Sequence, residues 1–191
     1  MNRWRNAGGS MHTGLHRTPL LFLLATLGVV VGAACSDRSN RQPIAVTIRC
    51  ADEGGIQQYV AMYRGRVVLL DFWATWCSPC VEQFPHLVKW QKKFGPDNLA
   101  IVTVSLDKES DLNSTVVPFL RNHGGPNMEF LLYSGGDHDK MVNAVNPNWT
   151  GEVPAMFLYD RAGRLCYSFG EEDKPAQIEK LIVKLLSPPE E

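Results

Sequence analysis

Cys77 and Cys80 are the residues of this 191-residue chain whose type and spacing most directly indicate chemistry. They lie three positions apart in the segment Trp76-Cys77-Ser78-Pro79-Cys80. A helix N-terminus offers unpaired backbone N–H groups and a favourable dipole, so it stabilises a thiolate, which is the form that attacks a disulfide. With a helix beginning at this segment, Cys77 attacks and Cys80, on the same face, closes the ring. We therefore interpret the pair as a reversible dithiol rather than a structural disulfide.

The sequence on both sides of the pair predicts the strand and the helix that this chemistry requires. Val67 to Trp73 is a dense apolar run with one acid, Asp71, which is typical of a strand covered on both faces. Pro79 has no N–H to lose and fits the first turn of a helix. Apolar residues then recur at near-helical spacing along one face, at Val81, Phe84, Val88 and Phe94. A buried strand therefore leads into a helix that carries both cysteines on its first turn.

The other cysteines and the histidines indicate no second site. A zinc half-site or a static disulfide is the alternative for the cysteine pair, and zinc requires two more ligands at ligand spacing. The chain has no second C-x-x-C, and His86, His123 and His138 are scattered, so we predict no metal site. Cys50 and Cys166 lie in predicted strands, where a buried apolar thiol is expected, with a disulfide between them as the alternative.

Several segments of the chain resemble the thioredoxin superfamily. Asp71-Phe72-Trp73-Ala74 is similar to the superfamily's strand before W-C-x-P-C, including its buried acid, and Pro85 matches the proline of the active-site helix. Gly151-Glu152-Val153-Pro154 is similar to the loop that carries the superfamily's cis-proline. From about Ile44 to Leu186, the order of predicted elements resembles the exported TlpA/ResA branch, which includes the CcmG/DsbE proteins.

This resemblance implies an α/β thioredoxin-like fold, with a central mixed β-sheet flanked by helices. It also implies an N-terminal extension and an insert, at about Lys108 to Trp149, between the active-site half and the cis-proline half. Helical spacing predicts helices at 114–123, 140–145 and around 178–185, and Asp52–Gly55 is predicted to be a turn. Apolar runs predict strands at Ile44–Ile48, Val67–Trp73, Leu99–Leu106, Phe130–Tyr133, Met156–Tyr159 and Arg164–Phe169.

The resemblance also implies roles for residues around the dithiol. Pro154 is expected to be cis and to face the cysteines, and the backbone beside it to pair with the substrate chain. Asp71 is expected to take the proton of Cys80, the alternative being a strand-end acid satisfied by the backbone. Gln83 departs from the branch, because many members have a glutamate there and this chain has Glu82 one residue earlier. The residues expected to contact substrate are Trp76, Ser78, Pro79, Val153 and Pro154.

The N-terminal residues have the pattern of a secretory signal peptide. Met1 to Pro19 is positively charged, and Leu20 to Val31 is an apolar run that is short for a membrane span. Gly32-Ala33-Ala34 before Cys35 resembles a bacterial lipobox, in which the cysteine is lipidated, although Gly32 stands where leucine is usual. Ordinary signal cleavage and an uncleaved anchor are the alternatives.

These features predict three parts of the chain: a lipoprotein-type signal peptide at 1–34, a tether at 35–43 and a thioredoxin-like domain at 44–188. All three interpretations of the N-terminus place the domain outside the cytoplasm. We therefore expect an exported protein, periplasmic or outside the cytoplasmic membrane, that is anchored to the membrane by lipid at Cys35.

The function that follows is thiol–disulfide exchange, as a protein-disulfide reductase without a cofactor. The net charge of −1 and the lack of a basic stripe exclude nucleic acid as a partner. The resemblance implies two protein partners: an oxidised client, with the haem-site thiols of apocytochrome c as one example, and a membrane electron donor of the thiol-relay type. The sequence names neither the client nor the donor.

Three other classes of protein remain as alternatives. A copper metallochaperone of the Sco type has C-x-x-x-C and a distant histidine, whereas two residues separate Cys77 and Cys80. A non-catalytic thioredoxin-like binding module is disfavoured by the intact W-C-S-P-C. A peroxidase of the peroxiredoxin type has a threonine three residues before its cysteine, whereas Thr75 lies two residues before Cys77.

Overall fold

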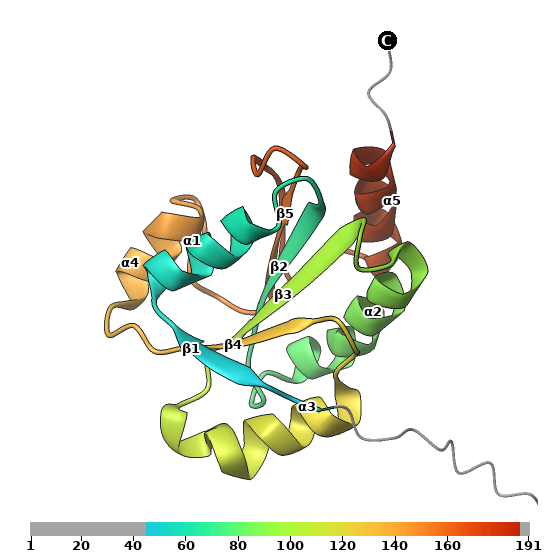
Figure 1. Ribbon diagram of the computed structural model, residues 1–191. Helices are drawn as coiled ribbons and strands as arrows, with labels where there is room; N and C mark the ends of the chain where they lie inside the picture. Colours follow the sequence, from blue (N-terminus) through green and yellow to red (C-terminus); the bar gives the residue numbers. More distant parts are fainter. Residues whose placement is uncertain (1–44, 188–191) are drawn as a thin grey trace, which may run out of the picture. The chain divides into compact units, whose positions relative to one another are not determined.

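The computed structural model describes residues 45–187 (Figure 1). The predicted signal peptide, the tether and the lipidation of Cys35 lie outside these residues and stay predictions. None of the helices in the described part is long and apolar enough to cross a membrane.

Six strands form one sheet in the order β1-β4-β3-β2-β5-β6. The pairs β1–β4, β4–β3 and β3–β2 are parallel, whereas β2–β5 and β5–β6 are antiparallel, so the sheet is mixed. Every residue of β2 and β3 is buried, which explains why their sequences are dense apolar runs without alternation. The strands are β1 Ile48–Ala51, β2 Val67–Trp73, β3 Leu99–Ser105, β4 Glu129–Tyr133, β5 Ala155–Tyr159 and β6 Leu165–Phe169.

Five α-helices cover the two faces of this sheet (Figure 1). Alternate residues of a strand point to opposite faces. Val68 and Leu70 of β2 share a core with α1 and α4, while Leu69 and Trp73 share a core with α2, α3 and α5. The helices are α1 Glu53–Met62, α2 Ser78–Phe94, α3 Val117–His123, α4 His138–Val145 and α5 Pro175–Leu186.

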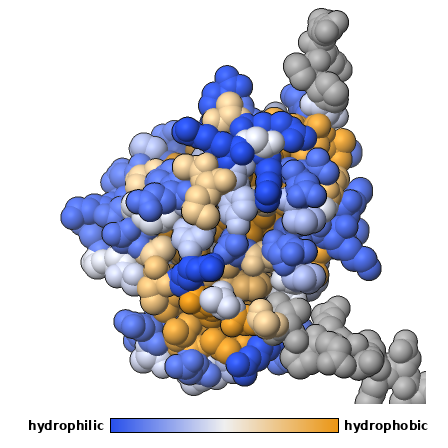
Figure 2. All heavy atoms as spheres, in the orientation of Figure 1, coloured by the Kyte–Doolittle hydropathy of each residue, from blue (hydrophilic) through white to orange (hydrophobic). Residues whose placement is uncertain are grey.

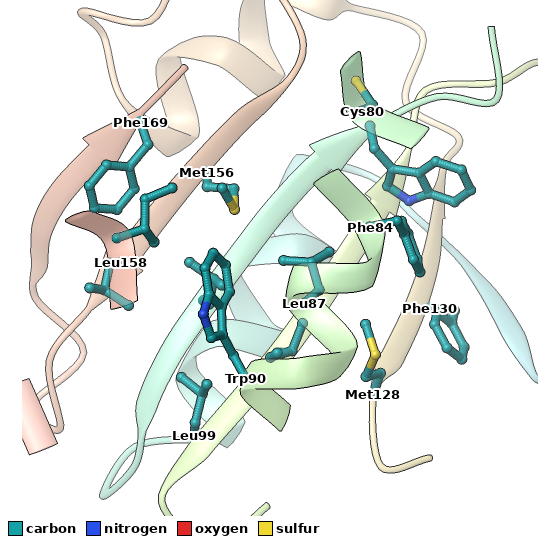
Figure 3. Close-up of a cluster of buried hydrophobic side chains, with 14 of the residues drawn as sticks. Cys80, Phe84, Leu87, Trp90, Leu99, Met128, Phe130, Met156, Leu158 and Phe169 are labelled. Atoms are coloured by element: carbon teal, nitrogen blue, oxygen red, sulfur yellow. The ribbon is translucent and has the colours of Figure 1, made fainter. Parts of the chain in front are cut away.

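The core beneath α2 fixes the helix that carries the dithiol. Figure 3 shows Trp90 of α2 on the side of Met156 and Leu158, Leu87 in the middle, and Phe84 on the side of Phe130. Fully burying a large apolar side chain contributes about 1.5–3 kcal/mol. Three such residues on one helix therefore hold its register against the sheet. Elsewhere the visible face is largely hydrophilic, with apolar residues gathered in the lower part of the view in Figure 2.

The first elements of the domain differ from the sequence prediction. The edge strand is Ile48–Ala51 and not Ile44–Ile48. Asp52–Gly55, predicted to be a turn, begins α1, because the Asp52 carboxylate accepts a hydrogen bond from the N–H of Gly55 and caps the helix. Ile56 and Val60 of α1 are buried, and this packing together with the cap offsets the low helix propensity of two consecutive glycines.

The helical part of the insert, expected from Ser114, begins earlier, at Glu109. A short 3-10 turn at Glu109–Asp111 and a π-helical turn at Leu112–Val116 lead into α3. Ser114 does not cap a helix, because its hydroxyl donates a hydrogen bond back to the carbonyl of Asp111.

Cys50 and Cys166 are exposed thiols and not the buried residues that the sequence suggested. They lie in β1 and β6, the two edge strands of the sheet. Five strand spacings of about 4.8 Å separate the edges, or about 24 Å, whereas a disulfide requires Cα atoms roughly 4.4–6.8 Å apart. A disulfide between these two residues within one chain is therefore excluded.

Candidate functional site

Cys77 and Cys80 form a disulfide at the N-terminus of α2, with their Cα atoms 5.3 Å apart. Cys77 is the N-cap residue, and its Sγ accepts a hydrogen bond from the backbone N–H of Cys80 at 3.3 Å. Pro79 occupies the first turn without losing a hydrogen bond. The exposed fraction is 6% for Cys77 and 3% for Cys80, so little of either is open to solvent. Once reduced, the Cys77 sulfur lies where N–H groups and the helix dipole favour a thiolate.

Asp71 lies in β2 on the face that α2 covers. Its side chain points to the same face as those of Leu69 and Trp73, which belong to the core beneath α2. Met156, the residue of β5 that pairs with Asp71, belongs to the same core. The side chain of Asp71 is buried, and Oδ2 has no hydrogen-bond partner among the described residues. Burial raises the pKa of Asp71 from 3.8 to about 8. This carboxyl group therefore exchanges its proton near neutral pH, on the face of the sheet that bears the cysteines.

The loop before β5 faces the dithiol from the other side. The Val153–Pro154 peptide bond is cis, as the resemblance implied. Pro154 and Pro79 line one hollow of about 350 Å³, and Val153 and Trp76 line another of about 600 Å³. The indole N–H of Trp149 donates to the carbonyl of Glu152 at 2.8 Å and holds this loop. The fold thus brings together residues separated by more than 70 positions in the sequence.

The 600 Å³ hollow beside the dithiol combines an apolar lining with acidic residues. Trp76 is 67% exposed, which is unusual for a tryptophan and leaves its ring free to contact another molecule. Ser78 is exposed at the start of α2 and lines neither hollow. The other residues that line the 600 Å³ hollow are Leu106, His138, Gly151, Glu152, Val153 and Glu171.

Gln83 lies near the sulfur of Met156, with Nε2 3.7 Å from Sδ. Met156 is the β5 partner of Asp71, so Gln83 contacts the strand residue that pairs with the buried acid. Glu82 is exposed and lines the 350 Å³ hollow together with Gln83.

Asp107 is a buried residue of this region that the sequence analysis missed. Its carboxylate accepts hydrogen bonds from the backbone N–H and the hydroxyl of Thr75 at 3.0 and 2.5 Å. Ser105 donates a third hydrogen bond at 2.7 Å. Asp107 follows the carboxyl end of β3, next to the carboxyl end of its parallel neighbour β2. This adjacency of the two strand ends could have indicated that Asp107 lies near Thr75. Because Thr75 is bound to Asp107, its hydroxyl is directed to that carboxylate.

The described residues contain no group of three or more His, Cys, Asp or Glu side chains that could hold a metal ion. The three histidines singled out in the sequence lie in different elements, with His86 in α2, His123 in α3 and His138 in α4. The reactive groups that the structure places in this region are the Cys77–Cys80 pair and the buried carboxyl group of Asp71.

Known proteins share both the sequence pattern and the fold. The sequence profile described as "AhpC/TSA family" matches residues 44–168. The thiol-disulfide oxidoreductase ResA of Geobacillus thermodenitrificans is 28% identical over 149 residues, which cover 76% of this chain and 80% of that protein. Relatives of the same name from Bacillus thuringiensis and Bacillus anthracis align over 65% of their length.

Solved structures give the same result for the fold. A putative thiol:disulfide interchange protein DsbE from Chlorobium tepidum is 27% identical, with a TM-score of 0.53 over 67% of this chain and 85% of that one. A thioredoxin family protein from Chlorobium tepidum TLS is 19% identical, with a TM-score of 0.55 over 66% of this chain and 84% of that one. The predicted thioredoxin-like fold and the resemblance to the ResA and DsbE proteins are thus confirmed.

Proposed function

The chain belongs to the AhpC/TSA family, and we propose that it is a thiol–disulfide oxidoreductase that reduces disulfides of exported proteins through Cys77 and Cys80. The observation that carries this proposal is the disulfide between these residues at the N-terminus of α2, opposite the Pro154 loop. The names of the relatives support the same reaction class.

In the reductive direction, the Cys77 thiolate attacks one sulfur of a client disulfide. The client S–S bond breaks, and its second sulfur leaves as a thiolate that takes up a proton. Cys80, deprotonated, then attacks Sγ of Cys77 and releases the first client sulfur as a thiol. Two electrons have passed to the client, and the Cys77–Cys80 disulfide remains.

Asp71 is the group that we assign to the proton of Cys80. A carboxylate accepts a proton best when its pKa lies near the pH of the reaction, and burial raises the pKa of Asp71 to about 8. With a pKa of about 8, roughly a tenth of the molecules hold Asp71 as the carboxylate at pH 7, and in these Oδ2, which has no other partner among the described residues, accepts the proton.

The two hollows beside Cys77 and Cys80, one lined by Pro79 and Pro154 and the other by Trp76 and Val153, together form what we call the dithiol cleft. Client recognition is assigned to the two walls of this cleft. The backbone beside Val153 and Pro154 pairs with an extended client segment, and Trp76 supplies an aromatic surface next to the reacting sulfur. Pro79 forms the wall on the α2 side, and the exposed Ser78 at the start of α2 is assigned to contact the client beyond the hollows. Because this mode of binding contacts mainly the backbone of the client, it accepts many client sequences.

The proposed setting is outside the cytoplasmic membrane, with a lipid anchor at Cys35. The electron donor is then a membrane protein of the thiol-relay type, and the client is an oxidised exported protein such as an apocytochrome c with oxidised haem-site thiols. Mass spectrometry of the membrane fraction, showing a diacylglyceryl group on Cys35, would test the anchor.

The reduction potential of the Cys77–Cys80 couple tests the direction of electron flow. Thiol trapping of the purified chain in graded redox buffers, beside a Cys80→Ala control that lacks the couple, measures it. We expect a value of about −250 mV or lower, as for thioredoxin-type reductants. A value of about −150 mV would make the protein an oxidase or isomerase, and no reversible couple would refute the enzyme assignment.

A further inference from the structure

A second concave surface lies between α2 and α5, away from the dithiol. It encloses about 770 Å³. Four of its lining residues are lysines, two from α2 and two from the start and middle of α5. We call this surface the lysine groove, and the residues that line it are His86, Lys89, Lys93, Lys174, Pro175, Ala176, Glu179, Lys180 and Val183.

The lysine groove carries uncompensated positive charge. Glu179 is its one acid, and this carboxylate is already engaged by Lys93 and by the indole N–H of Trp90 at 2.5 and 2.9 Å. Among the described residues, Lys89 and Lys180 form no ion pair, and the same holds for Lys174.

The surroundings of the dithiol have the opposite charge. Glu82, Glu171 and Asp173 line the hollow next to Pro79, and Glu152 lines the hollow next to Trp76. None of these carboxylates is in an ion pair with a described residue. The positive charge of the groove is therefore a local feature, since the chain as a whole is slightly acidic.

The groove is continuous with the dithiol cleft. His86 and Pro175 line both the lysine groove and the hollow that holds Pro79 and Pro154. A helix rises about 1.5 Å per residue, so Lys89 lies about 18 Å along the α2 axis from Cys77. An extended chain covers about 3.3 Å per residue, so roughly five residues of a bound protein would span this distance.

We propose that the lysine groove is a docking surface for an acidic segment of the protein that exchanges disulfides with Cys77. This proposal rests on the proposed function, because it concerns the partner in that reaction. Lysine side chains attract carboxylates and steer an acidic partner to the cleft. Val183 and Ala176 give the groove an apolar component that contacts the aliphatic parts of the segment. A concave groove that leads to the reacting sulfur suits a polypeptide better than a flat lipid surface.

Docking of this kind supplies selectivity that the dithiol cleft lacks. Backbone pairing beside Pro154 accepts many sequences, so a second contact some distance away is needed to favour one partner over others. The partner then has acidic residues about five to seven positions from its reactive cysteine, matching Lys89 and the more distant Lys93.

Two synthetic disulfide peptides test the proposal with the reduced full-length protein. One carries four glutamates beginning five residues from the disulfide cysteine, and the other has glutamines instead; each is made with the run on either side of the cysteine. The groove variant is Lys89→Gln with Lys180→Gln. Its matched control is Lys92→Gln with Lys184→Gln, two exposed lysines of the same helices that do not line the groove.

The measured quantity is the ratio of second-order rate constants for the glutamate and glutamine peptides. For the natural sequence at low ionic strength, we expect a ratio of about ten when the glutamates lie on one side of the cysteine. This ratio should fall as salt is added. We expect about two in the groove variant and an unchanged ratio in the control.

Equal rates with the two peptides would overturn the docking proposal and leave the proposed function intact. An equal loss of preference in the control variant would also overturn it, because the effect would then be one of net charge. Reduction of neither peptide would refute the proposed function itself. Binding to vesicles containing an anionic lipid that is lost in the groove variant, together with equal peptide rates, would assign the groove to a membrane and overturn the proposal.

Discussion

Two carboxyl groups that lie next to α2 have pKa values shifted in opposite directions, and this difference distinguishes the dithiol end of the helix from the part that lines the lysine groove. Near the dithiol, burial raises the pKa of Asp71 to about 8. In the lysine groove, hydrogen bonds from Lys93 and Trp90 hold the pKa of Glu179 below its usual range. The first group is poised to move a proton, and the second is fixed as a charge. The helix thus presents reactive chemistry at its buried start and charge recognition along its exposed middle.

Removal of the nucleophile at the dithiol end of α2 should have the largest effect, and this effect is on the rate of disulfide reduction. We expect Cys77→Ser to lower the rate of disulfide reduction by at least about a thousandfold, because a hydroxyl at this place is not ionised near neutral pH. Cys80→Ser should instead retain the attack and accumulate a mixed disulfide with the client. Mass spectrometry of the trapped species checks both. A mixed disulfide at Cys80 in the Cys77→Ser variant would reverse the assigned order of attack.

Removal of the buried acid should change the pH dependence of stability. Native Asp71 keeps its proton up to about pH 8, whereas the unfolded chain loses it near 3.8. Between these values the native state binds more protons, so unfolding free energy falls as pH rises, by about 1.4 kcal/mol per pH unit from this group. Asp71→Asn should remove this slope, so its stability relative to the natural chain should be about 4 kcal/mol higher at pH 8 than at pH 5.

Urea denaturation of the oxidised protein at pH 5 and pH 8 measures this difference. The matched control is Glu179→Gln in α5, whose carboxylate is bound by Trp90 and Lys93 of α2. Its lowered pKa contributes stability that is present at neutral pH and is lost only as pH falls through the native value, so it should not alter the change between pH 5 and 8. Parallel curves for the natural chain and Asp71→Asn would contradict a buried, protonated Asp71.

The smallest effect concerns the link between the core and the lysine groove. Trp90 is fully buried, and its indole N–H reaches Glu179. Trp90→Phe keeps most of the packing and removes this hydrogen bond, so we expect a loss of about 1–2 kcal/mol in unfolding free energy. The rate of reduction of a small uncharged disulfide should stay the same. A large change in that rate would show that the two ends of α2 are coupled.

The sequence predicted best those parts whose reasons are local. The dense apolar runs of β2 and β3 and the helical period of α2 each specify their own element. The positions of Cys77 and Cys80 on the first turn of α2 followed from the change of period alone. Their surroundings depended on the resemblance, since nothing near Pro154 in the sequence indicates that it faces the dithiol.

The failures have equally physical reasons. In α1, the cap in which Asp52 accepts a hydrogen bond from Gly55, together with the burial of Ile56 and Val60, offsets the two glycines that favoured a turn. The exposure of Cys50 and Cys166 depends on which strands lie at the edges, and that order is a property of the whole sheet. The lysine groove joins residues of α2 and α5 that are some 80 positions apart, so no local pattern contains it.

The two free thiols on opposite edge strands allow the width of the sheet to be measured. With Cys77 and Cys80 joined, the thiols among the described residues that meet an alkylating reagent are Cys50 and Cys166. Spin labels attached there would sit on opposite edge strands, in the range that dipolar spectroscopy measures well. Their separation would report whether the sheet keeps its width when the dithiol is reduced or a client is bound, without any cysteine being added to the chain.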